Sequence, residues 1–369
     1  MASFCFGKKT KGRCRRLQVL SRVFGAIQQS GNFTLDIDRV VMAPRARIII
    51  VSFNCADYLN RTLESLIAQE EGCFEVVIVD NASKDAQNIV LPVGDRRFEL
   101  RRQAENLGFA RANNIGAQGA ATPWLITLNP DAFPRPDWLG RLLAAAEQHP
   151  DVDMFGSTQL FDHDPQMIDG EGDCYSAFGM VWRAGHRQRR GPPYFDGPVF
   201  SPCACAAMYR RSLFEQVGGF DEDFFCYVED VDLGFRMRLA GGRAHQVGDA
   251  VVHHVSSGIS KQYGSFALYH GIRNLLWVIA KDVPMPLALL VAGLFCVLLV
   301  YLVGVHWRRE EVRPGLRGVA DGIKGLGPML VKRRAVQRGR VVSPWRVARW
   351  MVWNPLSAKN RRAVAKPGL

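Results

Sequence analysis

The sequence lacks the cysteine spacing of a metal-binding or disulfide-bonded framework. Its nine cysteines are an odd number, and no two of them form a Cys-x-x-Cys pair. A structural zinc ribbon and a disulfide scaffold are therefore excluded, and a reducing cytoplasm is the simplest interpretation. Cys203 and Cys205 could share one face of a strand, but two neighbouring thiols are more typical of packing than of metal ligation.

Acidic residues are scarce at both ends of the chain. Residues 1–22 carry seven basic side chains and no acid, and basic residues exceed acids by thirteen after Val305. The net charge of +12 therefore belongs to the two ends, and the body between them is mildly acidic. A nucleic-acid groove would need positive charge on the folded face, so this distribution favours an anionic membrane surface and no nucleic acid.

A secretory signal is also missing from the N-terminal segment. Its apolar part is interrupted by Arg22, and no small-residue cleavage site follows. We expect residues 1–45 to form a basic extension. Met42 stands just before the first strong strand, so either Met1 or Met42 could be the start of translation.

The sequence that follows alternates between strand and helix patterns. The run "RIIIVSFN" predicts a buried strand, the next segment a helix with one leucine-rich face, and "FEVVIVD" a second strand. Further strands are expected near 98–102, at "WLITL", near 152–160 and at "RAHQVGDAVVHH", with a helix over 229–240. Residues 162–201, rich in Gly, Pro, Asp and Arg, predict a long functional or mobile loop. This pattern predicts an α/β fold with a mostly parallel central sheet and flanking helices.

The C-terminal third contains a long uncharged stretch. Residues 264–281 predict a helix, and residues 283–305 carry no charge and are long enough to cross a bilayer. A single crossing would send the basic tail to the side opposite the body, against the positive-inside tendency for a cytoplasmic body. We therefore expect a linking helix (263–282), a monotopic or interfacial membrane segment (283–306) and a basic amphipathic helical tail (307–369). A buried core helix is the alternative for the uncharged stretch.

Polar residues follow three of the predicted strands, at Asp80, Asn106 and Asp131. Open α/β sheets bind ligands at the carboxyl ends of their strands, so these side chains are expected at one edge. A single Asp in a turn is usually a cap. Here, one carboxylate, one imidazole from the downstream pair His253-His254 and the phosphates of a ligand could complete the shell of a hard divalent cation.

A second acidic cluster lies in "FFCYVEDVDLGFRMR", which begins at Phe224. Asp232 is expected to pair with Arg236 four residues later on the same helix. Asp230, next to aromatic residues, could act as a general base toward an acceptor hydroxyl, with Glu229 orienting that acceptor.

These motifs together resemble the inverting family 2 glycosyltransferases of GT-A fold, and most closely their rhamnosyltransferase-like branch. The resemblance covers about residues 46–280 and continues into the tail through "GIKGLGPMLVKRRAVQRGR". It rests on the order and spacing of "VSFN", "VDNASKD", "ENLGFARANNIG", "LNPD", "GGFDEDFFCYVEDVDLGFR", "HHVSSGIS" and "RN".

The resemblance implies a role for each matching residue. Asp80 would recognise the nucleotide base in a pocket shared with Ser52, Asn54 and Asn81, and the ribose and diphosphate would pass Asn106, Gly108 and Asn113. Asn129 and Asp131 occupy the two ends of the family's Asp-x-Asp motif, which assigns the metal to Asp131. His254 matches the downstream metal-binding histidine, with His253 as its competitor. Asp230 matches the catalytic base of the Glu229-Asp230 pair, and Arg273-Asn274 a pair near the donor phosphates.

The implied protein has a GT-A domain over residues 46–262, with a nucleotide half (46–131) and an acceptor half (132–262). It would use Mg²⁺ or Mn²⁺ and transfer a sugar, such as rhamnose from dTDP-rhamnose, to a lipid-linked or oligosaccharide acceptor in cell-envelope synthesis. Its place would be the cytoplasmic face of the bacterial inner membrane.

Two other functions are compatible with this kind of fold. A non-catalytic envelope scaffold would show neither donor hydrolysis nor metal-dependent nucleotide binding. A nucleotidyltransferase would need a Gly-rich basic loop after the first strand, and "VSFNCADY" has none.

Overall fold

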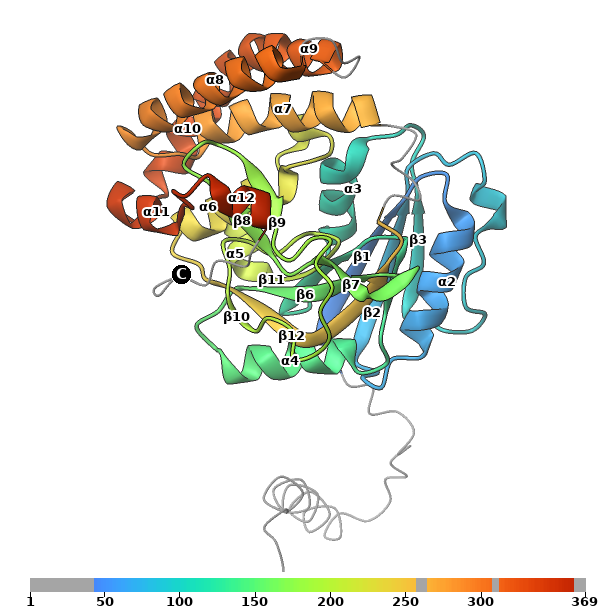
Figure 1. Cartoon of the computed structure of the whole chain (residues 1–369). Helices are drawn as coiled ribbons and strands as arrows, with labels where there is room; N and C mark the ends of the chain where they lie inside the picture. The colour runs from blue at the N-terminus through green and yellow to red at the C-terminus, as the bar shows by residue number, and fades with distance from the viewer. Residues whose placement is uncertain (1–42, 257–263, 307–311, 362–369) are drawn as a thin grey trace, which may run out of the picture. The chain divides into compact units, whose positions relative to one another are not determined.

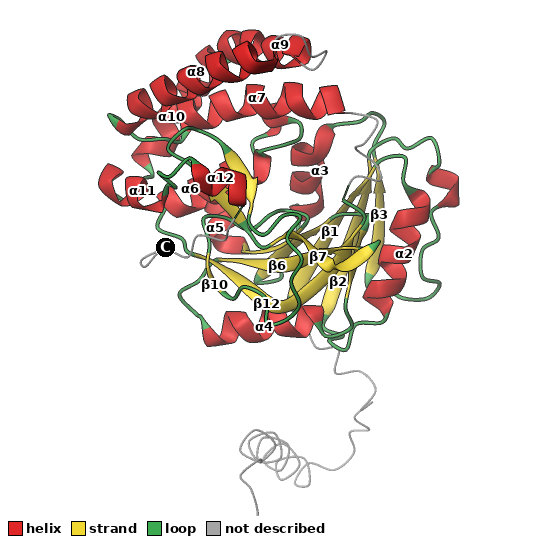
Figure 2. Ribbon diagram, viewed as in Figure 1, coloured by secondary structure: helices red, strands yellow, loops and turns green. Residues whose placement is uncertain are grey.

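A mixed sheet of ten strands runs through the body of the protein, with helices on both of its faces (Figures 1 and 2). The computed structural model describes residues 43–256, 264–306 and 312–361. Most of the expected N-terminal extension, and the choice between Met1 and Met42 as the start, lie outside the described residues. The strands of the sheet are β1 (Ala46–Ser52), β2 (Phe74–Asp80), β3 (Phe98–Arg102), β4 (Trp124–Leu128), β5 (Ala132–Pro134), β6 (Met154–Phe161), β7 (Asp164–Gly170), β10 (Gly197–Pro198), β11 (Ala206–Arg210) and β12 (Ala244–His254).

The N-terminal part of the sheet is parallel. Strands β3, β2, β1 and β4 lie side by side in that order, and β11 then joins antiparallel, between β4 and β6. Strand β12 runs parallel to β6 and also pairs with the short β5. This arrangement confirms the predicted α/β fold with a mostly parallel central sheet. Because Ser52 pairs with Asp80 in register, the first two strands end at the same level.

Successive side chains of β1 point to opposite faces of the sheet, and different helices cover each face. Ile48 and Ile50 point into a core with the leucines of α2 (Ala56–Ile67) and with α4 (Trp138–Gln148). Ile49 and Val51 point to the opposite face, toward α3 (Gly108–Ala117). The second face also receives the apolar side chains of α5 (Arg211–Gln216) and α6 (Glu229–Leu239). The predicted helix over 229–240 is thereby confirmed.

The expected long loop over 162–201 is wrong. This segment contains β7, which pairs with β6, and a hairpin of β8 (Asp173–Tyr175) and β9 (Val181–Arg183). Its Gly and Pro residues lie among short strands, of which β7 and β8–β9 form local hairpins and only β10 pairs with a distant strand, β12. Local composition alone does not show such pairing.

The C-terminal helices belong to the body of the protein. Helix α7 (Gly264–Lys281), confirmed as predicted, packs against α9 (Val312–Lys324) and α10 (Leu326–Arg338). The approach of α9 is close, because a Cβ added at Gly318 would lie 2.5 Å from the Tyr269 carbonyl oxygen. Helix α11 (Pro344–Trp350) buries Val347 and Trp350 in a second core, and α12 (Leu356–Asn360) follows. The region expected as a basic tail therefore contributes to the same packed core as α6.

Helix α8 (Leu287–His306) is long and apolar enough to cross a membrane by length and composition. Only 17% of this stretch is buried. Val291 and Phe295 pack into the second core, whereas Leu289, Val297 and Val300 are exposed. The alternative of a buried core helix therefore does not fit, because most of the apolar surface of α8 faces outward.

Candidate active site

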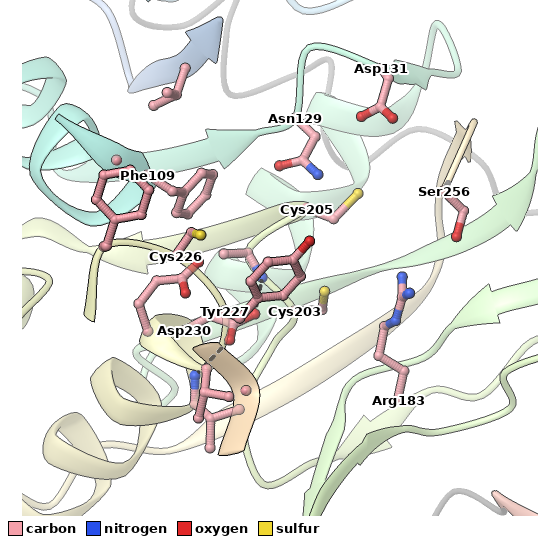
Figure 3. Close-up of a pocket in the computed structure, with 18 of the residues that line it drawn as sticks. Phe109, Asn129, Asp131, Arg183, Cys203, Cys205, Cys226, Tyr227, Asp230 and Ser256 are labelled. Atoms are coloured by element: carbon pink, nitrogen blue, oxygen red, sulfur yellow. Dashed lines mark hydrogen bonds between the residues drawn. The ribbon is translucent and has the colours of Figure 1, made fainter. Parts of the chain in front are cut away.

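A cavity of about 830 Å³ opens beside the carboxyl ends of the parallel strands. Figure 3 shows Asn129 and Asp131, both in the turn between β4 and β5, and Asp230 of α6 around it. The cavity brings together eight residues that the sequence predicted, namely Asn81, Asn106, Gly108, Asn129, Asp131, Glu229, Asp230 and His254. Asp131 and Asp230, which lie far apart in the chain, therefore face one space.

Asp131 and His254 meet because β5 pairs with the end of β12, with Ala132 opposite His254. The Oδ1 atom of Asp131 lies 3.2 Å from Nε2 of His254, and each of the two residues is only 5% exposed. On the other side of the ring, Nδ1 of His254 lies 2.8 Å from Oδ2 of the buried Asp169. Ser256 donates from its hydroxyl to the other oxygen of Asp169 at 2.7 Å. The imidazole is thus held with Nε2 facing Asp131.

This geometry fits a divalent cation held by few protein ligands. A metal-binding histidine commonly contacts a carboxylate through its second nitrogen, as His254 contacts Asp169. In residues 43–256, 264–306 and 312–361 there is no group of three or more His, Cys, Asp or Glu that could hold a metal. Asp131 and His254 are therefore suited to a cation whose remaining ligands come from phosphate and water. The competitor His253 does not line the cavity, and its charged neighbours are Arg135, Asp162 and Arg61.

Glu229 and Asp230 begin α6 at the wall of the cavity. Asp230 accepts hydrogen bonds from the backbone N–H groups of Ala204, at 3.0 Å, and Val231, at 2.8 Å. Glu229 is 7% exposed, and its Oε2 atom has no hydrogen-bond partner among the described residues. Burial raises the pKa of Glu229 well above its usual range, and the charge of Asp230 raises it further. Burial also raises the pKa of Asp230, but the two amides stabilise its charged form, so we assign the proton to Glu229 and the charge to Asp230.

The loop before α6 is strained and clamped. Phe225, Tyr227 and Val228 have φ values of 64°, 66° and 69°, a region that L-residues rarely adopt. The buried Asn274 of α7 holds this loop, because its Nδ2 atom lies 3.1, 3.0 and 2.6 Å from the carbonyl oxygens of residues 224, 226 and 227. These contacts fix the start of α6 and therefore the positions of Glu229 and Asp230.

A glycine lets helix α3 approach the same loop. The backbone N–H of Ala110 donates to the carbonyl of Phe225 at 3.1 Å. A Cβ added at Gly108, where φ is +80°, would lie 2.5 Å from the Phe225 ring. Gly108 is therefore required both by its backbone conformation and by this close contact.

Five predicted residues do not line this cavity: Ser52, Asn54, Asp80, Asn113 and Arg273. Ser52 and Asp80 are buried at the ends of β1 and β2, next to Asn81. Asn54 accepts from the backbone N–H of Lys84 at 2.8 Å, and Asn113 donates to the Phe109 carbonyl at 2.9 Å. Arg273 donates to the Phe224 carbonyl at 2.8 Å, so it supports the same loop as Asn274.

The sequence reasoning missed Asp169, Asp173 and Arg183, all in the segment expected to be a loop. Arg183 of β9 donates to Oδ2 of Asp169 at 2.6 Å, and Arg183 and Asp173 both line the cavity. Burial raises the pKa of Asp173 well above its usual range, and the charge of Asp230 adds to this effect. Asp169, Glu171 and Asp173 recur at every second position, and this strand-like spacing was the available signal.

Two thiols form part of the cavity wall. Cys203 and Cys205 both line it, and burial raises the pKa of each. They therefore contribute neutral, weakly polar surface between the two acidic groups of the site.

The chain resembles known glycosyltransferases over a region that includes the Asn129–Asp131 turn. The model of "Glycosyl transferase family 2" matches residues 47–218. The N-acetylglucosaminyl-diphospho-decaprenol L-rhamnosyltransferase of Mycobacterium tuberculosis is 30% identical in an alignment of length 250 that covers 60% of this chain and 80% of that protein. Rhamnosyltransferase WbbL of Escherichia coli is 28% identical over 215 residues, 54% of this chain and 79% of that protein.

Among solved structures, GalNAc-T7 with UDP, GalNAc and Mn²⁺ superposes with a TM-score of 0.51 at 16% identity, over 64% of this chain and 48% of that one. At this identity the likeness concerns the fold alone. The fold and the cavity together define a glycosyltransferase of GT-A type. The chain belongs to glycosyl transferase family 2, in its rhamnosyltransferase-like branch.

Proposed function

We propose that this enzyme is a metal-dependent inverting glycosyltransferase that adds a deoxyhexose, rhamnose, from a nucleoside diphosphate donor such as dTDP-rhamnose to a lipid-linked glycan of the cell envelope. The observation that carries this proposal is that the Asp131–His254 pair and the Asp230 carboxylate line one cavity. The printed names of the two relatives support rhamnose as the sugar, and the mycobacterial one supports an acceptor on a lipid diphosphate.

The reaction needs a base, and Asp230 supplies it. Its carboxylate takes the proton of the acceptor hydroxyl as that oxygen forms a bond to the anomeric carbon of the donor sugar. The bond from this carbon to the donor diphosphate breaks with its electron pair, and the nucleoside diphosphate leaves. A single displacement inverts the configuration at the anomeric carbon. Glu229, buried and protonated beside Asp230, is placed to donate a hydrogen bond to the acceptor.

The donor would lie along the carboxyl edge of the parallel strands. The cavity is lined there by Asn81, Asn106 and Gly108. The nucleoside would contact the residues at the ends of β1 and β2, namely Ser52, Asn54 and Asp80. Asp131 and His254 would hold the divalent cation, which when bound neutralises the charge that grows on the departing diphosphate. Asp169 keeps the His254 ring oriented for this purpose.

Membrane contact would bring the site to its acceptor. The exposed apolar side chains of α8 can enter a bilayer interface, and the basic side chains of α9 and α10 suit anionic headgroups. We place this surface on the cytoplasmic leaflet, where nucleotide sugars are available.

Two neighbouring histidines provide the test of the metal site. We expect wild-type protein to bind dTDP far more tightly with Mn²⁺ than with EDTA in calorimetry, and His254→Ala to lose this difference. His253→Ala, one residue earlier on the same strand, should keep it. Equal losses in both variants, or dTDP binding indifferent to Mn²⁺ in the wild type, would contradict the assignment.

A donor panel tests the reaction itself. Hydrolysis of dTDP-rhamnose, UDP-glucose and GDP-mannose would be followed with and without membrane extract as acceptor. We expect turnover with dTDP-rhamnose that membrane extract increases. A wild-type protein that turns over no nucleotide sugar would instead support a non-catalytic scaffold.

A further inference from the structure

Three arginines come together where the C-terminal end of the described chain reaches the cavity. We call Arg183, Arg187 and Arg361 the arginine rim. Arg183 and Arg361 both line the cavity. Burial lowers the pKa of the Arg361 guanidinium, and the positive charges of Arg187 and Arg183 lower it further, so both of these charges lie within electrostatic range of Arg361.

Backbone contacts build this rim from distant parts of the sequence. The N–H of Gly185 donates to the carbonyl of Arg361 at 2.6 Å, and the side chain of Gln188 donates to the carbonyl of Asn360 at 2.7 Å. Upstream of them, Val352 exchanges backbone hydrogen bonds with the β8 strand region through Tyr175 and Ala177. The C-terminal segment is thus fastened along the β8–β9 hairpin, which fixes Arg361 at the cavity.

Two of the three rim charges have no carboxylate partner among the described residues. Arg183 donates one bond to Asp169. Across residues 43–256, 264–306 and 312–361, neither Arg187 nor Arg361 has a carboxylate within ion-pair distance, whereas most other arginines near this sheet do. Arg187 and Arg361 are exposed, so both guanidinium groups are open to an anionic ligand that approaches from solvent. Guanidinium groups bind phosphate with two parallel hydrogen bonds, so a phosphorylated ligand is the suitable counter-ion.

Two substrates of the proposed reaction carry a diphosphate. The donor diphosphate already has its place at Asp131 and His254. The rim lies on other elements, and the charge of Arg183 acts on Asp230, the base that must face the acceptor hydroxyl. If the reacting hydroxyl of the acceptor sugar lies at Asp230, the diphosphate on the anomeric carbon of the same sugar would lie one sugar length away, toward the rim.

We propose that Arg183, Arg187 and Arg361 form a subsite for the diphosphate of the acceptor, which is then a glycosyl diphosphate carried by a prenyl lipid. This inference rests on the proposed function and adds to it the residues that would hold the acceptor diphosphate. It also gives Arg361, part of the basic C-terminal region, a role at the active site in addition to the membrane.

Geranyl diphosphate is the probe, because it carries the diphosphate and a short prenyl chain but no nucleotide. Binding to the full chain is measured by calorimetry in EDTA, and binding of dTDP with Mn²⁺ is measured separately. We expect Arg361→Ala and Arg187→Ala to weaken geranyl diphosphate about tenfold each, as removal of a charge-assisted hydrogen bond does. Arg361→Lys should recover most of the affinity, and the affinity for dTDP with Mn²⁺ should change less than about twofold in all variants.

Arg96→Ala is the matched control, since this exposed arginine before β3 does not line the cavity. It should leave both affinities unchanged. Unchanged geranyl diphosphate binding in Arg361→Ala and Arg187→Ala would overturn the inference, as would its absence in wild-type protein. A loss of dTDP–Mn²⁺ affinity instead would assign the rim to the donor and also overturn it.

The failure of this inference is distinguishable from failure of the proposed function. If wild-type protein turns over a nucleotide sugar but the rim variants bind geranyl diphosphate normally, only the acceptor subsite is wrong. If wild-type protein turns over none, the reaction itself is wrong whatever the rim binds.

Discussion

The parallel strands and the C-terminal helices reach the same active site by different physical routes. Strands β1 and β2 end in Ser52 and Asp80, and Asn129 follows β4, so these polar residues lie at one edge because parallel strands point the same way. Helix α7 reaches it with Phe266 and Gly271, which line the cavity, whereas α10 and α11 pack in the core shared with α6. The polar contacts of α7 to α6 and its loop come from single side chains. The first region is organised by local pattern, the second by tertiary contact.

The C-terminal region is fastened to the catalytic region through buried charges. Nζ of Lys281, at the end of α7, lies 2.5 Å from carboxylate oxygens of both Asp221 and Asp232. Lys332 of α10 contacts Asp221 as well and lies 2.7 Å from Asp223. Net charge, which suggested a membrane tail, therefore does not distinguish basic residues that face a membrane from those that anchor a helix.

The largest expected effect is at Asp230, where the two regions meet. Asp230→Asn removes the general base, and we expect kcat to fall about a thousandfold with an unchanged fold. Asp249→Asn, an exposed carboxylate on β12, is the control and should retain full activity. Near-normal turnover in Asp230→Asn would refute the assigned role.

The same residue sets the pH dependence of the reaction. Because burial raises the pKa of Asp230, kcat should fall as the pH drops through a value above the usual range for an aspartate, where the base becomes protonated. A kcat that stays constant down to the ordinary aspartate range would show that Asp230 is not the base.

Two tryptophans of one helix test whether the C-terminal helices are part of the core. Trp350 is 4% exposed and Trp345 is 80% exposed. Trp350→Ala should lower the free energy of unfolding by about 3 kcal/mol, because it leaves a large cavity. Trp345→Ala should change it by less than about 0.5 kcal/mol. Equal losses of unfolding free energy in the two variants, measured by chemical denaturation, would mean that α11 does not pack into the core.

Asn274 tests whether the clamp on the strained loop serves catalysis. Asn274→Ala should reduce kcat by about tenfold to a hundredfold while the KM for the donor changes little, because a small displacement of the base is enough. Asn114→Ala also removes an asparagine that bonds to backbone, at Phe220, but leaves the 225–228 loop clamped. If both variants lose stability and activity in the same proportion, Asn274 has only a structural role.

The smallest expected effect concerns the charged anchor. Lys332→Ala should lower the free energy of unfolding by about 1 kcal/mol, because its partner Asp221 is mostly buried. The Lys324–Asp321 pair is more exposed, so Lys324→Ala should have almost no effect. Thermal unfolding of the two variants side by side would measure the difference, and a larger loss in Lys324→Ala would contradict this ranking.

Several site features were predictable because they depend on nearby residues. The pairing of Asp232 with Arg236 is confirmed, with Arg236 Nη2 2.6 Å from Oδ2 of Asp232. It follows from helical spacing alone. The choice between His253 and His254 could not follow from sequence spacing in the same way. It depends on which face of β12 turns toward the cavity, and the Asp169 contact to His254 crosses 85 positions.

The sequence by itself determined the alternation of strands and helices, the polar edge of the parallel sheet and the acidic start of α6, because periodicity and helix spacing act within a few residues. Only the tertiary structure decided that Asn274 clamps the loop before Asp230, that Asp169 orients His254 and that Arg361 lines the cavity. These contacts join segments far apart in the chain, and packing of whole elements, not local preference, brings them together.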